Sequence, residues 1–226
     1  EDLDALKSLE EIRENEEARL ANQEISVHQI LASVQNLMTA LQLYGTPQFA
    51  RQARMAFMAR AFLRSLTECG PASEPGTSWF PAEDVDAFMQ SISTVATEFE
   101  RDFRDFSMDR MTRAEFNRKY GHLRVGTYDI RTERYDQMNF RPGPSRHRQR
   151  TEGRPDALEL SRIQQALDEH SISVEAGQLI HFIRSAVRQR EYFKFEFTKS
   201  LSLILELLIR TGNVLEIARQ DLSWLK

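Results

Sequence analysis

The sequence predicts an all-α protein of about seven or eight helices, one of them long and near the C-terminus. Three observations lead to this fold class. Apolar residues recur mostly at helical spacing, the nine glycines and seven prolines gather in a few short segments, and strand-like alternation is confined to residues 123–130. The 226 residues suffice for one large domain or two small ones, and we expect a single helical domain spanning residues 1–226.

The N-terminal part predicts three helices. Residues 3–21 place leucines and an isoleucine on one side of a highly charged segment, although residues 1–25 are also a candidate hinge or linker. Ser26 is a suitable N-cap for a second helix that we expect to end at Gly45. Thr46-Pro47, a cap followed by proline, predicts the start of a third helix that reaches about Cys69, and a loop follows over residues 70–80.

The C-terminal part predicts the remaining helices. We expect a helix over residues 81–106, and a short one that begins with the capping box at residues 112–115 and ends at residues 120–121. Residues 137–156 are basic and contain proline and glycine, which predicts a mobile loop. Helix resumes near residue 156, pauses at residues 170–173, and then runs over residues 174–210 until Gly212 closes it. A last short helix is expected from about residue 213.

Composition excludes several classes of function. The formal net charge of −4 gives no whole-molecule attraction to nucleic acid. The longest apolar stretch, residues 201–209, is short and interrupted, so no membrane span is expected. A single cysteine rules out an internal disulfide, which favours a reducing, cytoplasmic location. The chain starts without methionine or a signal peptide, so we expect a piece of a longer protein.

The stretch YGHLRVGTYDI, residues 120–130, interrupts the helical pattern. Gly121 and Gly126 permit backbone angles that other residues avoid, and between them His122 and Arg124 can point towards one ligand. Residues 120–155 hold eight arginines and four acidic residues, and arginine suits carboxylate or phosphate groups. The simpler alternative is that Arg124 and Arg134 pair with Asp129 and Glu133 while His122 caps the preceding helix.

A second stretch, RQREYFKFEFTKSL at residues 188–201, interleaves aromatic and basic side chains. Aromatic walls with a few charges are typical of a small-molecule pocket, whereas the alternative is a core helix whose lysines and arginines extend to solvent. The intervening glutamates argue against single-stranded nucleic acid. The five histidines have no ligand spacing, so no metal site is expected. No glycine-rich phosphate loop is present, and Cys69 has no histidine near it in the sequence.

These stretches carry a family resemblance. Residues 116–137, FNRKYGHLRVGTYDIRTERYDQ, resemble a motif of the phosphoenolpyruvate synthase / pyruvate phosphate dikinase-like phosphotransferases, among them rifampin phosphotransferase. Residues 190–208 and the ending LEIARQDLSWL resemble the long helix and tail of phosphoenolpyruvate-utilising proteins from bacterial surface-polysaccharide clusters. The likeness is close over roughly 60 residues of the chain. Val125 stands where the family has proline, and Glu216-Ile217 replace its usual glycine.

The resemblance implies the place of this chain in a larger enzyme. Such enzymes combine an ATP-grasp domain, a swivelling domain with a phosphorylated histidine, and an acceptor domain. The first two patterns are not found in this sequence, so the resemblance implies the central helical, acceptor-binding domain. By itself this domain is expected to be inactive and to bind no cofactor. ATP and Mg²⁺ are implied for the parent, and the implied partners are its two other domains and a small-molecule acceptor.

The resemblance also implies roles for residues. Arg124 would stabilise negative charge on the phosphoryl group or acceptor, His122 would hydrogen-bond or act as general base, and Asp129 would orient Arg124 or accept a proton. The further substrate-binding candidates are Tyr120, Arg134, Arg190 and Lys194. The alternative function, from a different class, is a non-catalytic helical interaction or spacer module.

Overall fold

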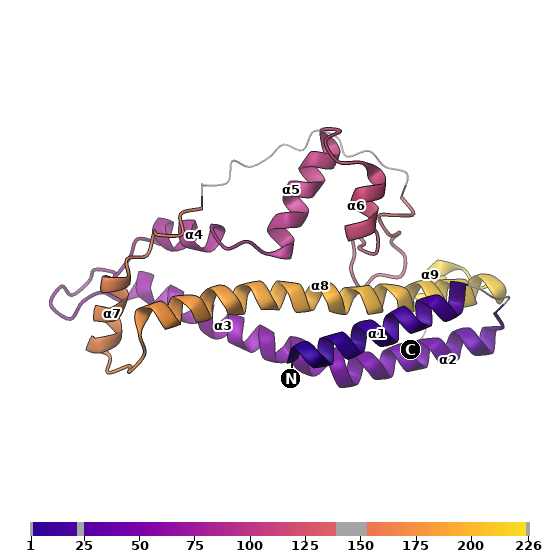
Figure 1. The fold of residues 1–226 in the computed structure, drawn as a ribbon, viewed down its shortest axis with the longest axis horizontal. Helices are drawn as coiled ribbons and strands as arrows, with labels where there is room; N and C mark the ends of the chain where they lie inside the picture. The colour runs from indigo at the N-terminus through magenta and orange to yellow at the C-terminus, as the bar shows by residue number, and fades with distance from the viewer. Residues whose placement is uncertain (1, 22–24, 139–152, 225–226) are drawn as a thin grey trace. The chain divides into compact units, whose positions relative to one another are not determined.

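The computed structural model describes residues 2–21, 25–138 and 153–224, and its fold is all-α as predicted (Figure 1). The described residues contain no β-strand, only an isolated antiparallel bridge between Arg124 and Arg134. None of their helices is both long and apolar enough to cross a membrane. The elements are α1 (Asp2–Ala21), α2 (Val27–Ala40), the π-helix η1 (Leu41–Gly45), α3 (Thr46–Glu68), α4 (Ala82–Gln90), α5 (Val95–Ser107), α6 (Arg113–Tyr120), α7 (Leu160–Glu169), α8 (Ala176–Val214) and α9 (Arg219–Leu222).

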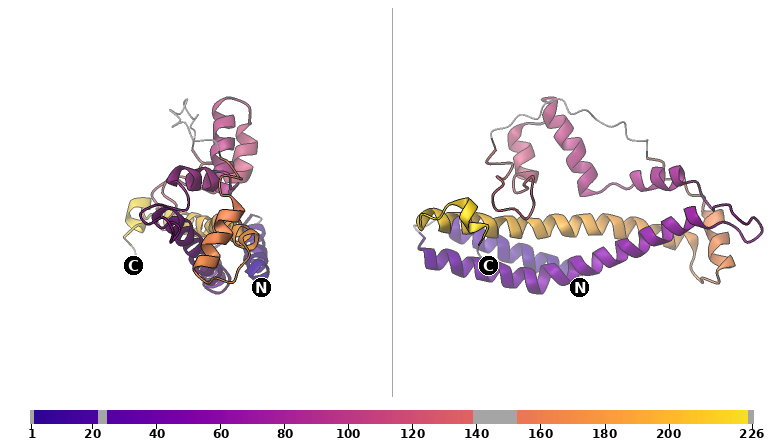
Figure 2. Two further views of the ribbon diagram at one scale, coloured as in Figure 1. Left: turned by 90° about the vertical axis from the view of Figure 1, so that its left-hand side faces the viewer. Right: turned by 180° about the vertical axis from the view of Figure 1, so that it is seen from behind.

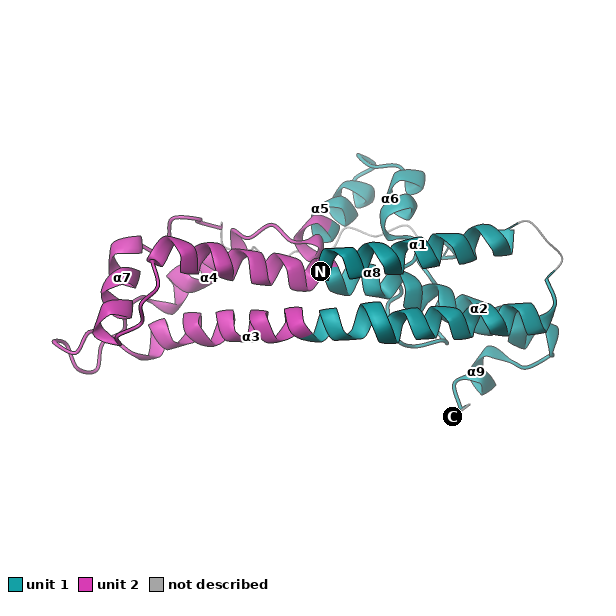
Figure 3. Ribbon diagram, turned by 60° about the horizontal axis from the view of Figure 1, so that its bottom comes forward, with its two compact units in different colours: residues 1–50, 99–145, 193–226 teal, residues 51–98, 146–192 magenta. Residues whose placement is uncertain are grey.

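The chain divides into two compact units (Figure 3). Unit 1 comprises residues 1–50, 99–145 and 193–226, and unit 2 comprises residues 51–98 and 146–192. Both α3 and α8 contribute residues to each unit. Most of the predicted basic loop at 137–156 falls on residues 139–152, which lie outside the described part of the chain.

Unit 1 has two apolar clusters. In the first, α1, α2 and the C-terminal part of α8 pack through leucines and isoleucines, and Figure 2 shows α1 and α2 running side by side. Ile30 and Leu37 of α2 are completely buried there. In the second cluster, α5 and α6 pack through aromatic rings, with Phe116 at its centre. Unit 2 has a separate core from α3, α4, α7 and the N-terminal part of α8, in which Phe88, Ile163 and Ile183 are completely buried.

The single helix predicted over residues 81–106 is wrong, because α4 and α5 are separate helices. Thr94 and Thr97 explain the break. Each backbone N–H donates to the hydroxyl of the other, at 2.9 Å from Thr94 and 3.3 Å from Thr97. This reciprocal capping satisfies the free donors at the start of α5, so a new helix begins where the apolar spacing alone suggested continuity.

The predicted stop at Gly45 is also wrong, because helical structure continues through η1 into α3. The Thr46 N–H donates to the Leu41 carbonyl five residues earlier, which is the π-helical pattern. This widening lies directly before Pro47, whose ring would clash with the carbonyl four residues earlier in a regular α-helix. Gly45 serves packing instead, since an added Cβ would lie 3.0 Å from Cδ2 of Phe197.

The long helix α8 was predicted to close at Gly212 but continues to Val214. Its end is a Schellman motif, in which the Ile217 N–H donates to the Gly212 carbonyl at 2.8 Å. The left-handed position of this motif belongs to Glu216, with φ of 57°. The last helix, α9, therefore begins later than the predicted residue 213.

Candidate functional site

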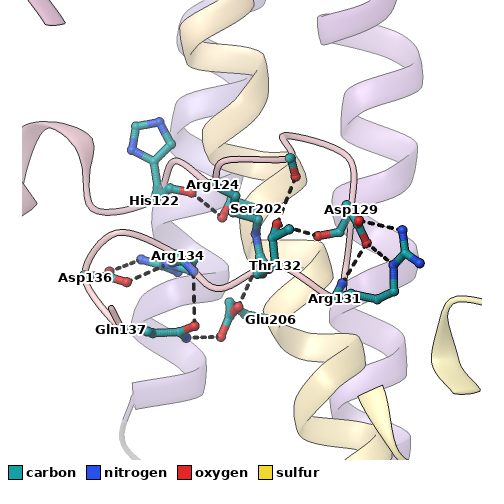
Figure 4. A network of polar contacts seen from close by, with 11 residues as sticks. His122, Arg124, Asp129, Arg131, Thr132, Arg134, Asp136, Gln137, Ser202 and Glu206 are labelled. Atoms are coloured by element: carbon teal, nitrogen blue, oxygen red, sulfur yellow. Dashed lines mark hydrogen bonds and ion pairs between the residues drawn. The ribbon is translucent and has the colours of Figure 1, made fainter. Parts of the chain in front are cut away.

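The segment that follows α6, residues 121–138, forms a loop in unit 1 with its own hydrogen bonds (Figure 4). Its two ends pair across the Arg124–Arg134 bridge. The Tyr135 N–H donates to the Leu123 carbonyl at 2.9 Å, and the Asp136 N–H donates to the Gly121 carbonyl at 3.2 Å. These bonds hold the side chains of the loop in fixed directions.

Glycine occupies positions 121 and 126 of the loop for a different reason from the predicted one. Neither has a positive φ, which among the described glycines belongs to Gly76. Instead, an added Cβ at Gly121 would lie 2.4 Å from the Asn117 carbonyl oxygen, and one at Gly126 would lie 3.0 Å from Cβ of Asp129. Close approach of neighbouring atoms, rather than an unusual backbone angle, therefore favours glycine at these positions.

Arg124 fastens the loop to α8. Its side chain is 1% exposed, forms an ion pair with Glu206, and donates to the Thr132 carbonyl at 2.7 Å. Gln137 donates to the other Glu206 oxygen. Burial lowers the pKa of Arg124, and the Glu206 carboxylate opposes this effect. The guanidinium thus already has a carboxylate and a carbonyl as partners inside the protein.

Asp129 is paired with Arg131 at the far end of the loop. The Arg131 guanidinium donates to both carboxylate oxygens at 2.8 Å, and its backbone N–H donates at 2.9 Å. These bonds from Arg131 lower the pKa of Asp129 to about 2. The ion pairs of the loop are therefore Asp129 with Arg131, Arg124 with Glu206, and Arg134 with Asp136.

Tyr120 lies in the aromatic cluster of unit 1, where it is 2% exposed and meets Phe99 edge to face at 5.0 Å between ring centroids. Its hydroxyl donates to Asp102 at 3.0 Å, and Lys119 donates to the same oxygen at 2.7 Å. Burial alone would raise the pKa of Asp102, but the hydrogen bonds from Lys119, Tyr120 and Arg101 lower it overall. These contacts join α5 to α6.

His122 points away from the Arg124–Glu206 pair (Figure 4). Its carbonyl accepts a hydrogen bond from Ser202 of α8 at 2.6 Å, and its ring meets Phe195 edge to face at 4.9 Å. Its Nε2 atom is buried and has no hydrogen-bond partner among the described residues. Burial, followed by the positive charges of Lys199, Arg134 and Arg13, lowers the pKa of His122 to about 3. The imidazole is therefore neutral at physiological pH.

A polar cavity of about 220 Å³ in unit 1 contains His122 in its wall. Four elements meet there, namely α1, α6, the 121–138 loop and α8. Only one of the lining side chains is apolar. The lining residues are Arg13, Glu17, Asn117, Arg118, His122, Arg134, Lys199 and Leu203.

The cavity brings together two of the predicted site residues, His122 and Arg134. Arg124, Asp129 and Tyr120 belong to the same unit but are not among its lining residues. Lys194 is not among them either, and Arg190 belongs to unit 2, where it pairs with Glu191. Three aromatic residues of the second predicted stretch pack within unit 1, Phe193 and Phe197 in the first cluster and Phe195 in the second. The fourth, Tyr192, belongs to unit 2 and is 40% exposed.

Sequence reasoning did not select Arg13, Arg118 or Lys199 for the site. Arg118 had a usable signal, since it precedes His122 by four residues at the end of a predicted helix, and such positions share a face. Lys199 lay in the second stretch but was not chosen. Arg13 had no signal, because it is one charge in a highly charged helix.

The described residues contain no group of three or more His, Cys, Asp or Glu side chains arranged to hold a metal ion. The cavity instead offers guanidinium, ammonium, amide and imidazole groups, which are donors suited to an anionic or polar ligand. Comparisons of the chain with family models, with curated proteins and with solved structures gave no match.

Proposed function

We propose that this chain is the central helical, acceptor-binding domain of a phosphoenolpyruvate-synthase-like phosphotransferase. The observation that carries the proposal is the cavity of unit 1. The loop with the family-like motif places His122 and Arg134 in one polar wall with side chains from α1, α6 and α8. In this proposal the parent is a cytoplasmic bacterial enzyme. ATP, with Mg²⁺, phosphorylates a histidine on another domain, and that histidine carries the phosphoryl group to the cavity.

The cations and the volume of the cavity suit the binding of a phosphoryl group and part of its acceptor. The transferred group carries its charge on three oxygens, and proteins assist mainly by positioning it and by placing cations around it. Pockets for drug-sized ligands have volumes of about 300–1,000 Å³. A cavity of about 220 Å³ is smaller, so it suits the reacting end of an acceptor rather than a whole large molecule.

The proposal gives different tasks to the loop residues. His122 lies at the reacting group, where its neutral imidazole can form a hydrogen bond to the acceptor. To take a proton from the acceptor it needs the pKa-raising effect of an anion bound beside it. Arg124, with Glu206 and the Thr132 carbonyl as partners, holds the loop in place. It is therefore a positioning residue, and the charge-stabilising role passes to Arg134 and its cationic neighbours in the cavity.

The first test is the gene on both sides of this segment, which we expect to encode an ATP-grasp region and a Ser-His motif. The parent protein is then incubated with labelled ATP and with candidate acceptors such as pyruvate, sugars, lipid-linked intermediates and antibiotic-like molecules. We expect label on a histidine outside residues 1–226, followed by transfer to one acceptor. A parent that takes no label from ATP would overturn the proposal.

A matched pair of variants locates the acceptor step. His122→Gln should leave histidine labelling unchanged and reduce transfer to the acceptor by about a hundredfold or more, the range expected for a lost proton-transfer group. His28→Gln, at an exposed position of α2, should leave both steps unchanged. Equal transfer by the two variants would remove His122 from the site.

One observation favours the alternative of a non-catalytic interaction module. Val125, Tyr128 and Trp224 are 72%, 63% and 75% exposed. Tyr128 and Trp224 line an open groove of about 640 Å³ in unit 1, together with neighbouring residues of the loop. If this surface carries the function, Tyr128→Ser and Trp224→Ser should abolish partner binding, whereas His122→Gln should not affect it.

A further inference from the structure

We propose that the His122 cavity binds a small, doubly charged oxyanion, the chemistry shared by inorganic phosphate and the end group of a phosphate monoester. This inference deepens the proposed function by naming the ligand class, and it rests on that function for the identity of the anion.

The charge of the cavity wall favours an anionic ligand. Four cationic side chains and one carboxylate, Glu17, line the cavity. Three cations have acidic partners: Arg134 pairs with Asp136, Lys199 with Glu196 at 2.8 Å, and Arg13 with Glu17 at 3.4 Å. Arg13 also pairs with Glu10 at 3.8 Å and with Glu14 at 3.7 Å; of all these acids Glu17 alone lines the cavity, so the wall itself presents four cations and one carboxylate.

Arg118 adds an available donor. It is exposed and has no hydrogen bond or ion pair within the part of the chain that the structure describes. Its planar guanidinium can donate two parallel hydrogen bonds to one oxyanion, as arginine does with phosphate. The neighbouring Lys119 is paired with Asp102, so the two consecutive cations of α6 differ in their availability.

The neutral state of the His122 imidazole also favours an anionic ligand. The charged side chains that line the cavity together with His122 come from four elements. They are Arg13 and Glu17 on α1, Arg118 on α6, Arg134 on the loop, and Lys199 on α8. Three of these cations help to keep the imidazole neutral. An anion among them would cancel part of that field, so a bound dianion and a protonated His122 stabilise each other.

The size and polarity of the space argue against apolar and cationic ligands. A volume of about 220 Å³ with only Leu203 as an apolar wall gives little hydrophobic contact to a ring or an acyl chain. A cation would meet the same positive field that lowers the pKa of His122. A small oxyanion is the class for which the wall offers opposite charge and several donors.

The test is an NMR titration of the 226-residue chain with labelled histidine, using inorganic phosphate at constant ionic strength. Without phosphate, we expect the His122 ring to stay neutral from pH 8 down to about pH 4. At pH 8, where inorganic phosphate is the dianion, added phosphate should shift the ring resonances of His122, and the shift should saturate as the phosphate concentration rises. A parallel titration uses phenyl phosphate, which is a phosphate monoester. If phenyl phosphate binds more tightly than inorganic phosphate, the ligand of the cavity is the end group of a phosphate monoester rather than free phosphate.

The charge requirement is tested by Lys199→Gln and Arg118→Gln, with Lys194→Gln as the matched control on α8. Each cavity variant should weaken phosphate binding about tenfold, which corresponds to about 1.4 kcal/mol, while Lys194→Gln should bind as the unchanged chain does. Circular dichroism confirms that the variants fold. Absence of phosphate binding in the folded chain, or equal effects of all three variants, would overturn the inference.

The two proposals fail in distinguishable ways. If phosphate does not bind but the parent enzyme transfers label in a His122-dependent manner, the ligand class is wrong and the proposed function stands. If phosphate binds and shifts the ring resonances of His122, but the parent takes no label from ATP, the cavity is an oxyanion site and the phosphotransferase proposal fails.

Discussion

At the scale of single residues, unit 1 contains several buried polar groups that have been matched by neighbours far away in the sequence. Arg124 meets Glu206, and Asp102 meets Lys119 and Tyr120. The Nε2 atom of His122 and the Nε atom of Arg124 are both buried without a hydrogen-bond partner among the described residues, but of these two side chains His122 alone lines the cavity. Matched groups stabilise the fold, whereas a buried unmatched group costs free energy and is a reason to look for a ligand there.

The Arg124–Glu206 pair gives a prediction on stability. Arg124→Ala removes the cation paired with the partly buried Glu206 carboxylate and deletes the bond to Thr132, so we expect a loss of about 3 kcal/mol in the free energy of unfolding. Urea denaturation followed by circular dichroism measures it. Arg131→Ala, at the exposed pair with Asp129, is the control and should lose much less. Equal losses would show that Arg124 does not fasten the loop.

Asp102 gives a prediction on pH dependence. Its pKa in the folded protein is lowered from the ordinary 3.8, so its contribution to stability is present above about pH 4 and is lost as the pH falls through the lower folded value. Asp102→Asn should therefore cost about 2 kcal/mol at pH 7 and clearly less at pH 3. Denaturant midpoints of both proteins at the two pH values measure this, and a pH-independent difference would contradict it.

The sequence predicts some residues of the candidate site but not their partners. His122 and Arg134 could be chosen because they lie in one short stretch that breaks the helical pattern. The partner of Arg124 could not be chosen, because Glu206 lies 82 residues away and many acids were equally plausible. Arg13 and Lys199 join the cavity only through the packing of α1 and α8 in unit 1, which helix periodicity does not reveal.

At the scale of elements, local rules worked where the signal was a side chain acting on its own backbone. The capping boxes at Ser26 and at Thr112 both form, and α2 and α6 begin there. Glycine was a weaker guide. Gly45 and Gly212 were expected to end helices, yet both lie within continuous helical structure, where an added Cβ would crowd the side chains of Phe197 and Leu222.

The end of α8 provides a prediction at this scale. Glu216 occupies the left-handed position of the Schellman motif, which glycine adopts at lower cost. Glu216→Gly should stabilise the protein by about 0.5–1 kcal/mol, after allowing for the greater chain entropy of glycine when unfolded. Thermal unfolding measures the change. Glu216→Ala keeps a side chain in the strained position and should give no such gain, so equal stabilisation would refute the explanation.

At the scale of the whole molecule, composition and periodicity were sufficient for the all-α class, but the existence of two compact units was not predicted. The reason is that neither unit is a continuous segment. Unit 2 consists of residues 51–98 and 146–192, and both α3 and α8 pass from one unit to the other without a glycine, proline or loop at the change. Linker signals, on which domain prediction relies, are absent at those points.

Separate cores predict separate local stability. Leu37→Ala, in the core of unit 1, and Ile183→Ala, in the core of unit 2, should each cost about 2–5 kcal/mol, since both side chains are completely buried. Amide hydrogen exchange measures where protection falls. We expect Leu37→Ala to reduce it mainly in α1 and α2, and Ile183→Ala mainly in α4 and α7. Uniform loss of protection in both variants would show a single cooperative unit.

The π-helical segment before Pro47 has a consequence for how the length of this chain can change. A π-turn accommodates one residue more than an α-helix does without altering the direction of the residues on either side. Deleting one residue from 42–44 would therefore keep every later side chain of α3 in phase, but it would bring the proline ring against the backbone. The deletion and Pro47 are thus coupled: shortening should be harmful alone and tolerated together with Pro47→Ala, so a homologue that is one residue shorter here is expected to lack the proline as well.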